Sequence, residues 1–245
     1  MGWLPQAEIR ARSRVAVVGV LALVASGCGL LGEEGSGVLV SRRLQIPAEI
    51  ERVEIGDAFR VTIRVARAAP SGEITMDDNL LDRLRVEVDG DTIGIDLDGR
   101  VRDATLRAEI DLMRLRRVDV SGASRARVEG RVTDDLTIGA SGASEVEIGS
   151  VDLDELFLSV SGASEVSIDG SAEQISADVS GASRIALFGV EGGEVEVDLS
   201  GASEAEVTAR DRLEARASGA SSVRYRGDPD RVITDASGAS SVEPA

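Results

Sequence analysis

Carboxylates are the reactive groups that this chain holds in abundance. Its 245 residues include 44 Asp and Glu, 27 basic residues that are all Arg, one Cys and no His. Two carboxylates can serve as acid and base in glycoside hydrolysis, and clustered carboxylates can bind Ca²⁺ in a lyase. Histidine chemistry is excluded, and the sequence has neither a glycine-rich phosphate loop followed by a helix nor zinc-ligand spacing. A carbohydrate-active enzyme outside the cell is therefore the alternative function that these residues leave open.

The segment closest to a calcium loop is Asp89 to Gly94, DGDTIG. It lacks the third acidic ligand, and no Glu stands at the offset where such a loop closes. Alternating apolar residues flank it on both sides within residues 85–98. A β-hairpin that turns about Asp89-Gly90-Asp91 is the better interpretation, so we expect no metal site and no cofactor.

The single cysteine, Cys28, follows a segment typical of exported proteins. Three arginines between residues 10 and 14 precede a short apolar run, Val15 to Val24, which is too short to span a membrane as a helix. Ala25-Ser26-Gly27 then stand directly before the cysteine. This arrangement resembles a bacterial lipobox, and the resemblance implies cleavage before Cys28 and lipid attachment to it. A plain secretory signal with an incidental cysteine is the alternative.

We expect two distinct segments at the start of the chain. Residues 1–27 form a lipoprotein signal peptide, and residues 28–37 form a flexible, glycine-rich tether. Two or three acyl chains on Cys28 would anchor the protein stably to a membrane. Gly29 rather than Asp follows the cysteine, which favours the outer membrane in a bacterium with two membranes.

The charge balance limits the choice of partner. The whole chain has a net charge of −17, and residues 28–245 keep 24 arginines against 43 acidic residues, which gives −19. Such a chain repels nucleic acid and anionic lipid, so neither is an expected ligand. The charges solubilise a long sheet surface and discourage pairing between sheet edges.

The elements that would hold these side chains come from a repeat. The tetrapeptide Ser-Gly-Ala-Ser occurs seven times, with successive spacings of 20, 20, 19, 20, 18 and 19 residues. A period this regular indicates one structural unit stacked on copies of itself. The first two positions of each copy are the expected structural residues: Ser121 and Gly122, Ser141 and Gly142, Ser161 and Gly162, Ser180 and Gly181, Ser200 and Gly201, Ser218 and Gly219, and Ser237 and Gly238.

Apolar residues alternate on both sides of each tetrapeptide. The copy at Ser161 follows Leu156, Leu158 and Val160, and it precedes Val166 and Ile168. Alternation with period two predicts strands with one buried face. Strands that recur every ~20 residues pair in parallel with the copy above, about 4.8 Å away. The fold class is therefore all-β: a right-handed parallel β-solenoid with ~20-residue coils and an irregular N-terminal cap.

The register at each tetrapeptide has two possible forms. A continuous register places Gly162 and Ser164 on the inward side, where the glycine lets the strand bend around a narrow core. The inward serine hydroxyl would then bond to the backbone at the bend or to the serine of the next coil. A bulge at Ser-Gly would instead turn Ala163 inward. We expect the continuous register.

The N-terminal third keeps the strand pattern without the tetrapeptide. Residues 53–61 align with residues 118–126, so Gly56-Asp57-Ala58-Phe59 reads as a degenerate first copy. Residues 77–83 predict one short helical turn. We therefore expect a cap with degenerate coils over residues 38–120 and the seven-copy solenoid over residues 121–245, and residues 38–245 form one continuous domain.

Four segments together resemble a known family. They are GDAFRVTI, DDNLLDRLRVEVDGDTIGI, the SGAS ladder, and the closing ASSVRYRGDPD with SGASSV. Over residues 45–243 the chain is similar to the putative auto-transporter adhesin, head GIN domain proteins. The resemblance implies a β-solenoid protein of the bacterial envelope, and it brings no catalytic residues.

These observations predict a lipid-anchored, non-enzymatic envelope protein that presents a rigid acidic surface for adhesion or interaction. A repeat shows the same side-chain types at every coil, whereas catalysis needs an asymmetric cluster at one place. Expected partners are the membrane, through Cys28, and an envelope or host glycan or protein. A catalytic site would have to lie in the loops, such as Gly149–Asp154 or Phe188–Gly193.

Overall fold

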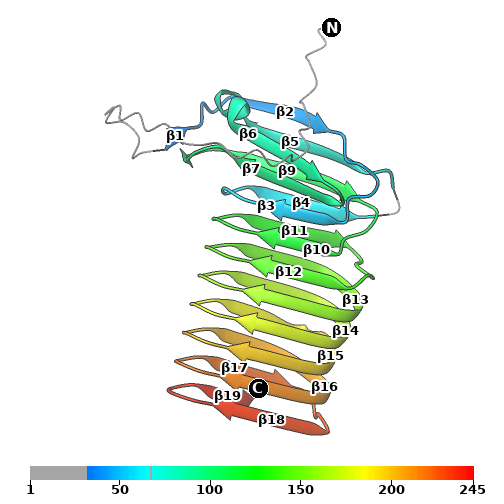
Figure 1. The fold of residues 1–245 in the computed structure, drawn as a ribbon, viewed down its shortest axis with the longest axis vertical. Helices are drawn as coiled ribbons and strands as arrows, with labels where there is room; N and C mark the ends of the chain where they lie inside the picture. The colour runs from blue at the N-terminus through cyan, green and yellow to red at the C-terminus, as the bar shows by residue number, and fades with distance from the viewer. Residues whose placement is uncertain (1–31, 67) are drawn as a thin grey trace, which may run out of the picture.

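The alternating apolar residues build two stacks of parallel strands that face each other across a narrow core (Figure 1). This computed structural model describes residues 32–66 and 68–245. The described residues form nineteen strands and one 3-10 helix. The result is a long column of coils with a broader cap at the end nearest the N-terminus (Figure 1).

The cap holds the elements up to residue 112. They are β1 (Glu33–Glu34), β2 (Leu39–Leu44), β3 (Arg52–Ile55), β4 (Arg60–Val65), β5 (Ser71–Asp77), η1 (Asp78–Arg83), β6 (Leu84–Asp89), β7 (Thr92–Leu97), β8 (Val101–Arg102) and β9 (Leu106–Leu112). The column holds β10 (Arg117–Val120), β11 (Arg125–Gly130), β12 (Leu136–Ala140), β13 (Glu145–Val160), β14 (Glu165–Val179), β15 (Arg184–Leu199), β16 (Glu204–Ala217), β17 (Ser222–Arg226), β18 (Arg231–Ala236) and β19 (Ser241–Pro244).

Each coil of the column pairs in parallel with its neighbours. We call the strands that lead into a Ser-Gly-Ala segment, together with β3 and β7 that pair in line with them, the first stack: β7, β3, β10, β12, the second halves of β13 to β16, and β18. The strands that lead away from it form the second stack: β9, β4, β11, the first halves of β13 to β16, β17 and β19. The predicted parallel β-solenoid with coils of about 20 residues is confirmed.

The predicted alternation is confirmed on both sides of the tetrapeptide. Leu156, Leu158 and Val160 are at most 3% exposed, and so are Val166 and Ile168. Such residues from both stacks form one continuous core that runs from the cap through the column. Burial of this apolar surface is the main term that stabilises the column.

The expected inward position of the glycine is wrong, and so is the bulged alternative. Gly162 and Ala163 are both exposed, whereas Ser164 is 2% exposed. The glycine has φ +80°, which reverses the chain in a tight corner instead of bending a strand around the core. Val160 and Ser164 are four residues apart. Because this number is even, the alternation that turns Val160 inward also turns Ser164 inward.

The structure also tests the three expectations for the N-terminal third. The degenerate copy is confirmed, because Val53 pairs with Val118 and Val61 with Ala126, as aligned. The short helical turn is confirmed as η1. The hairpin is confirmed by the antiparallel pairing of β6 and β7, with Gly90 in the turn at φ +60°.

The order of coils in space differs from their order in the chain. The coil formed by β3 and β4 lies between β7 and β9 on one side and β10 and β11 on the other. After β4 the chain therefore forms the remaining cap elements, β5 to β9, and it enters the column only at β10. Antiparallel strands β6, β5 and β2 close the N-terminal end of both stacks.

The last part of the expected tether is not free. β1 pairs in parallel with β8, and the Asp77 carboxylate accepts the N–H of Gly37 at 2.7 Å and the N–H of Thr105 at 2.7 Å. These contacts hold residues 33–37 against the cap, and the Asp77 carboxylate needs both donors because it is only 2% exposed. Residues 28–31 lie outside the described residues.

Candidate functional site

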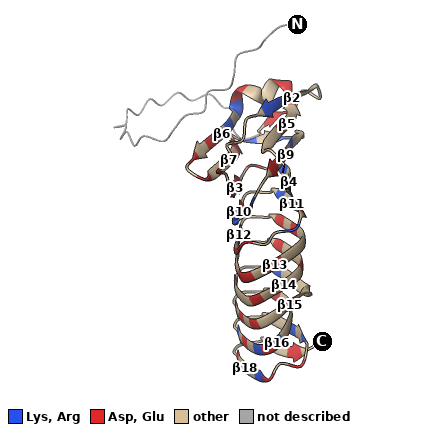
Figure 2. Ribbon diagram, turned by 90° about the vertical axis from the view of Figure 1, so that its right-hand side faces the viewer, with Lys and Arg blue, Asp and Glu red and all other residues tan. Residues whose placement is uncertain are grey.

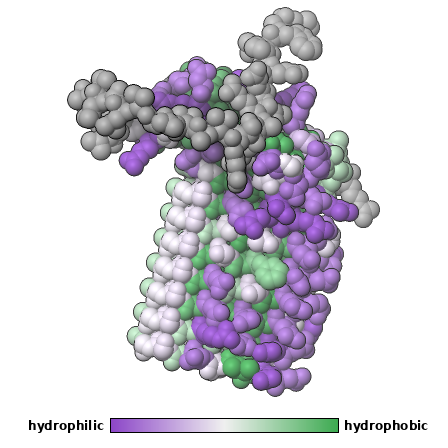
Figure 3. Space-filling view, viewed as in Figure 1, coloured by the Kyte–Doolittle hydropathy of each residue, from purple (hydrophilic) through white to green (hydrophobic). Residues whose placement is uncertain are grey.

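The seven Ser-Gly-Ala corners stack into a ladder along one edge of the column. Their glycines all have φ between +75° and +80°. The N–H of Ala163 donates to the carbonyl of Gly142 at 2.7 Å, and the other inner corners repeat this bond. A Cβ on Gly162 would overlap that same carbonyl oxygen. The ladder is the pale band at one edge of the column in Figure 3.

The structure places every expected motif residue in this ladder. The first serine and the glycine of each copy lie at the corner: Ser121, Gly122, Ser141, Gly142, Ser161, Gly162, Ser180, Gly181, Ser200, Gly201, Ser218, Gly219, Ser237 and Gly238. The corners present only hydroxyl, methyl and backbone groups, so they offer neither an acid nor a base. Their observed contacts are those of a structural element.

The second serine is buried, as expected, in the first six motifs, and Ser240 in the last motif is partly buried. Ser164 Oγ donates to the carbonyl of Ser161 at 2.9 Å and accepts the N–H of Ser144 at 3.3 Å. The same carbonyl bond recurs at Ser144, Ser203 and Ser221. One hydroxyl thus satisfies polar groups of two successive coils inside the core.

A groove follows the first stack beside the corners, and we call it the corner groove. Its upper part is a hollow of about 570 Å³ over β3, β7, β10 and β12, and its lower part is a hollow of about 370 Å³ that continues over β14, β15, β16 and β18. Ser159 and Ser161 line both parts, so the groove runs along the column.

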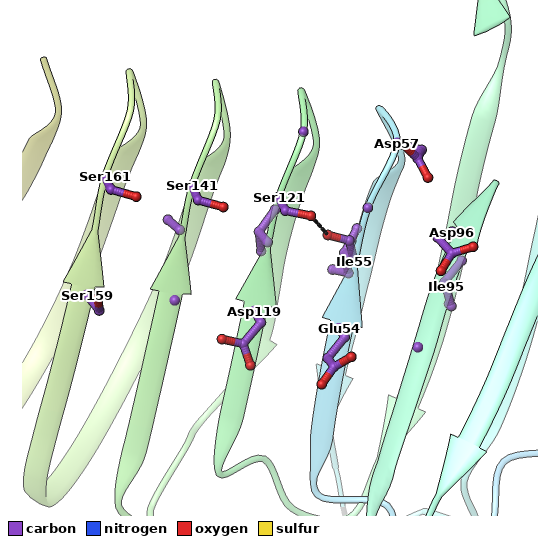
Figure 4. Close-up of a pocket in the computed structure, with 16 residues that line it drawn as sticks. Glu54, Ile55, Asp57, Ile95, Asp96, Asp119, Ser121, Ser141, Ser159 and Ser161 are labelled. Atoms are coloured by element: carbon purple, nitrogen blue, oxygen red, sulfur yellow. Dashed lines mark hydrogen bonds between the residues drawn. The ribbon is translucent and has the colours of Figure 1, made fainter. Parts of the chain in front are cut away.

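The upper part of the corner groove is acidic. Glu54, Asp57, Asp96 and Asp119 line it (Figure 4). Asp119 accepts a hydrogen bond from Arg117 at 3.0 Å, and Asp57 accepts the N–H of Leu97 at 3.1 Å. Burial, and then the negative charge of Asp57, raise the pKa of Asp96 above its ordinary value. The groove therefore offers mainly hydrogen-bond acceptors and a negative potential.

Two glycines at outward strand positions make this groove deep. Gly139 lies beside Asp119 and Gly94 lies beside Glu54 in the strand register, and both line the hollow. A Cβ at Gly139 would overlap the Asp119 carboxylate. Sequence reasoning missed this groove. The available signal was glycine at an outward position of two otherwise alternating strands, TIGI and TIGA.

The lower part of the corner groove and the second stack carry paired charges. Arg216 donates to Asp198 at 3.1 Å and to Glu196 at 2.7 Å, and these contacts raise its pKa. On the second stack Arg184 bridges to Glu204 at 3.0 Å. Acidic and basic residues both lie along the column (Figure 2). Such exposed ion pairs place opposite charges beside each other on neighbouring coils, but they contribute little to the stability of the fold.

The two loops expected to hold any catalytic group lie within the coils. Residues 149–154 are part of β13, and residues 188–193 are part of β15. Hydrogen bonds from Arg131 and Ser171 lower the pKa of Asp152, so this carboxylate is poorly suited to act as a general acid. Arg226 stacks on the Phe188 ring at 3.9 Å.

Two further observations concern only the part of the chain that the structure describes. No group of three or more His, Cys, Asp or Glu residues there is placed to hold a metal ion. No helix there is long and apolar enough to cross a membrane. Cys28 and the whole expected signal peptide, residues 1–27, lie outside the described residues.

The comparisons with known proteins agree with this geometry. The family model described as "Putative auto-transporter adhesin, head GIN domain" matches residues 50–229. No curated protein sequence matches the chain. A putative adhesin from Bacteroides fragilis has a similar structure, with a TM-score of 0.82 and 20% identity, over 87% of this chain and 100% of that one.

Two other solved structures share the fold. A putative adhesin from Parabacteroides merdae has a TM-score of 0.68 and 19% identity, over 86% of this chain and 98% of that one. A putative lipid binding protein from Parabacteroides distasonis has the same TM-score, 0.68, with 19% identity, over 86% of this chain and 98% of that one. At these identities the likeness establishes the fold alone.

Proposed function

The chain belongs to the family described as putative auto-transporter adhesin, head GIN domain, and from that premise we propose that it is a lipid-anchored, non-enzymatic adhesion protein of the bacterial cell envelope. The family and the similar structures named as adhesins support an exported protein with an adhesion role. The lipid anchor and the lack of catalysis are the finer parts of the proposal.

The observation that carries the proposal is the corner groove on a rigid column. The groove extends over coils from β7 to β18, and it carries carboxylates in both its upper and its lower part beside the corner ladder. An extended surface of repeated acceptors suits the binding of a large partner more than the turnover of a small substrate. An envelope or host glycan or protein is the proposed class of partner.

Anchoring is proposed to occur through Cys28. The described chain begins to pair at Glu33, so only a few residues separate the cysteine from the cap. Lipid on Cys28 would therefore hold the cap close to the membrane, and the column would be attached at its N-terminal end. In a bacterium with two membranes we propose the outer membrane as the site.

Adhesion is tested with cells that carry the wild-type gene, a deletion, or a complementing copy. Binding of cells to host-cell or matrix surfaces should fall on deletion and return with the wild-type copy. A Cys28→Ala copy should leave the protein unanchored and fail to restore binding, and mass spectrometry of the wild type should show diacylglycerol at Cys28. Equal adhesion of the deletion and wild-type cells would rule out the adhesion role.

The enzymatic alternative is tested on the same protein. The purified chain is incubated with acidic and neutral polysaccharides, with and without Ca²⁺, and reducing ends and unsaturated products are measured. We expect no turnover. Turnover that disappears in an Asp152→Asn or Glu191→Gln variant would replace the adhesion proposal with a carbohydrate-active enzyme.

A further inference from the structure

Phe157 is an unusual residue for its place on the column. It lies on the outer surface of the first stack, in β13, and it is 45% exposed. Its neighbours in the strand register are Thr137 above and Ser176 below. Both side chains are much smaller, so the aromatic ring stands above the surface that surrounds it.

A hollow of about 130 Å³ opens beside this ring. Ser176 lies between Phe157 and Glu196 in the register of three adjacent strands. The small serine therefore leaves a gap between the ring and the carboxylate of about two strand spacings, ~9–10 Å. Five polar residues and three apolar residues form the rest of the wall: Gln174, Glu194, Glu196, Arg212 and Glu214, and Leu156, Ile175 and Val195.

Several of these polar groups have unused hydrogen-bonding capacity. Within residues 32–66 and 68–245, the Gln174 amide and the Glu194 carboxylate have no side-chain hydrogen bond or ion pair. Arg212 pairs with Glu214 through Nη2, but its Nε is buried and has no partner in the same part of the chain. Because this Nε is buried, a ligand would contact Arg212 only through the exposed part of its side chain, which is 38% exposed overall.

The combination of groups indicates a class of ligand. An aromatic face takes the apolar C–H face of a sugar ring, and carboxylate, amide and guanidinium groups beside it take the ring hydroxyls. Nucleic acid is disfavoured by the net charge of −17, and an amphipathic helix would need a longer apolar groove than one ring provides.

We propose that Phe157, Gln174, Glu194 and Arg212 form a glycan-binding site in which one hexose ring stacks on Phe157 above Ser176. The site lies next to the corner groove, since Ser159 of the same strand lines both parts of that groove. A longer glycan would continue from the hollow into the groove. This proposal rests on the adhesion function, because it names the partner through which the column would act.

The test uses the purified full chain on an array of neutral, amino and acidic glycans, followed by titration of the best hexose-containing ligand. Phe157→Ala should weaken binding by about tenfold, the loss of one aromatic stacking contact. Phe157→Tyr keeps the ring and should retain binding. Ser176→Gln leaves the ring intact but fills the hollow, and it should abolish binding without lowering the melting temperature.

Met113→Ala is the matched control, because Met113 is 44% exposed and lies at the edge of the cap, away from the hollow. It should bind as the wild type does. Wild-type affinity in both Phe157→Ala and Ser176→Gln would overturn the site, and so would failure of every glycan to bind. Binding of choline without binding of any glycan would also overturn it, because the ring would then be a cation site.

The same variants separate this proposal from the adhesion function. If deletion abolishes adhesion but cells with Phe157→Ala adhere normally, the glycan site is wrong and the adhesion role stands. If the purified protein binds glycan through Phe157 but deletion leaves adhesion unchanged, the site stands and the adhesion role fails.

Discussion

Two corners of the fold, one in the column and one in the cap, use different residues for the same turn. In the column, Gly162 turns at φ +80° directly against the carbonyl of Gly142. At the aligned position in the cap, Asp57 turns at φ +55° and Ala58 follows at φ +67°. An L-residue with a side chain rarely adopts such angles, so the cap corner is the more strained of the two.

The neighbouring coil explains the difference. The strand beside Asp57, β7, ends at Leu97 and does not form a Ser-Gly-Ala corner of its own. Space is therefore available for the Asp57 side chain, and its carboxylate accepts the N–H of Leu97. In the column every corner from Gly142 onward has another Ser-Gly-Ala corner against it, and only glycine leaves room for the carbonyl of that corner. Stacking, more than the turn angle alone, requires the glycine.

The largest expected effect tests that conclusion with three glycines. Gly162→Ala combines a positive φ with overlap against the Gly142 carbonyl, and it should lower the free energy of unfolding by about 3 kcal/mol. Gly90→Ala has φ +60° but open space, and it should cost about 1 kcal/mol. Gly149→Ala has neither constraint and should change stability little. Urea unfolding of the full chain measures all three, and equal costs at positions 90 and 162 would show that the angle alone decides.

The next effect tests how the cap is held. Asp77→Ala would leave the N–H groups of Gly37 and Thr105 without their acceptor, at a cost of about 2–3 kcal/mol. Hydrogen exchange should speed up over residues 33–37 while β14 in the column stays protected. Asp82→Ala, at an exposed position of η1, is the control and should leave exchange unchanged. Equal acceleration in β14 would mean that cap and column open as one unit.

A smaller effect tests the buried serines, which the column has and the first cap corner lacks. Ser164→Ala removes the donor to the Ser161 carbonyl and the acceptor for the Ser144 N–H, and it should cost about 1 kcal/mol. Ser161→Ala, at the corner surface, should cost clearly less. Thermal unfolding measures both, and the reverse order would contradict the role of the inward serine.

The smallest effect is a pH-dependent change in stability, which should have opposite signs for one carboxylate in the cap and one in the column. Burial raises the pKa of Asp96, so its carboxylate opposes folding at neutral pH, and Asp96→Asn should raise stability there. Hydrogen bonds from Arg131 and Ser171 lower the pKa of Asp152, so Asp152→Asn should reduce stability at neutral pH. Both differences should shrink as the pH falls below the ordinary carboxyl value of 3.8. Urea unfolding at pH 7 and pH 3 checks the two signs, and a shared sign would contradict the assigned causes.

Several local features followed from the residue pattern because each depends on nearby residues. The alignment of residues 53–61 with 118–126 predicted a degenerate copy of the repeat, and the structure forms that copy as the coil of β3 and β4. The Asp-Gly-Asp segment predicted the β6–β7 hairpin. The inward serine was also predicted, because its distance from the preceding apolar residues is even.

Other features could not be read from neighbours in the sequence. The corner groove arises at two glycines that are far apart in the chain. In the stack, Gly94 lies beside Glu54 and Gly139 lies beside Asp119, and Glu54 and Asp119 are neighbours. The attachment of residues 33–37 depends on Asp77, a residue that the sequence placed only in a helical turn. In both cases the deciding contact joins residues many positions apart.

The sequence by itself determined the coil: its length, its buried face and the place of each corner, since a period of about 20 residues and a period of two suffice for parallel stacking. The tertiary structure decided which way the corner glycine faces, the position of the β3–β4 coil between the rest of the cap and the column, and the hollow beside Phe157. Those features depend on which atoms of the next coil occupy the space, and the pattern within one coil carries no information about that neighbour.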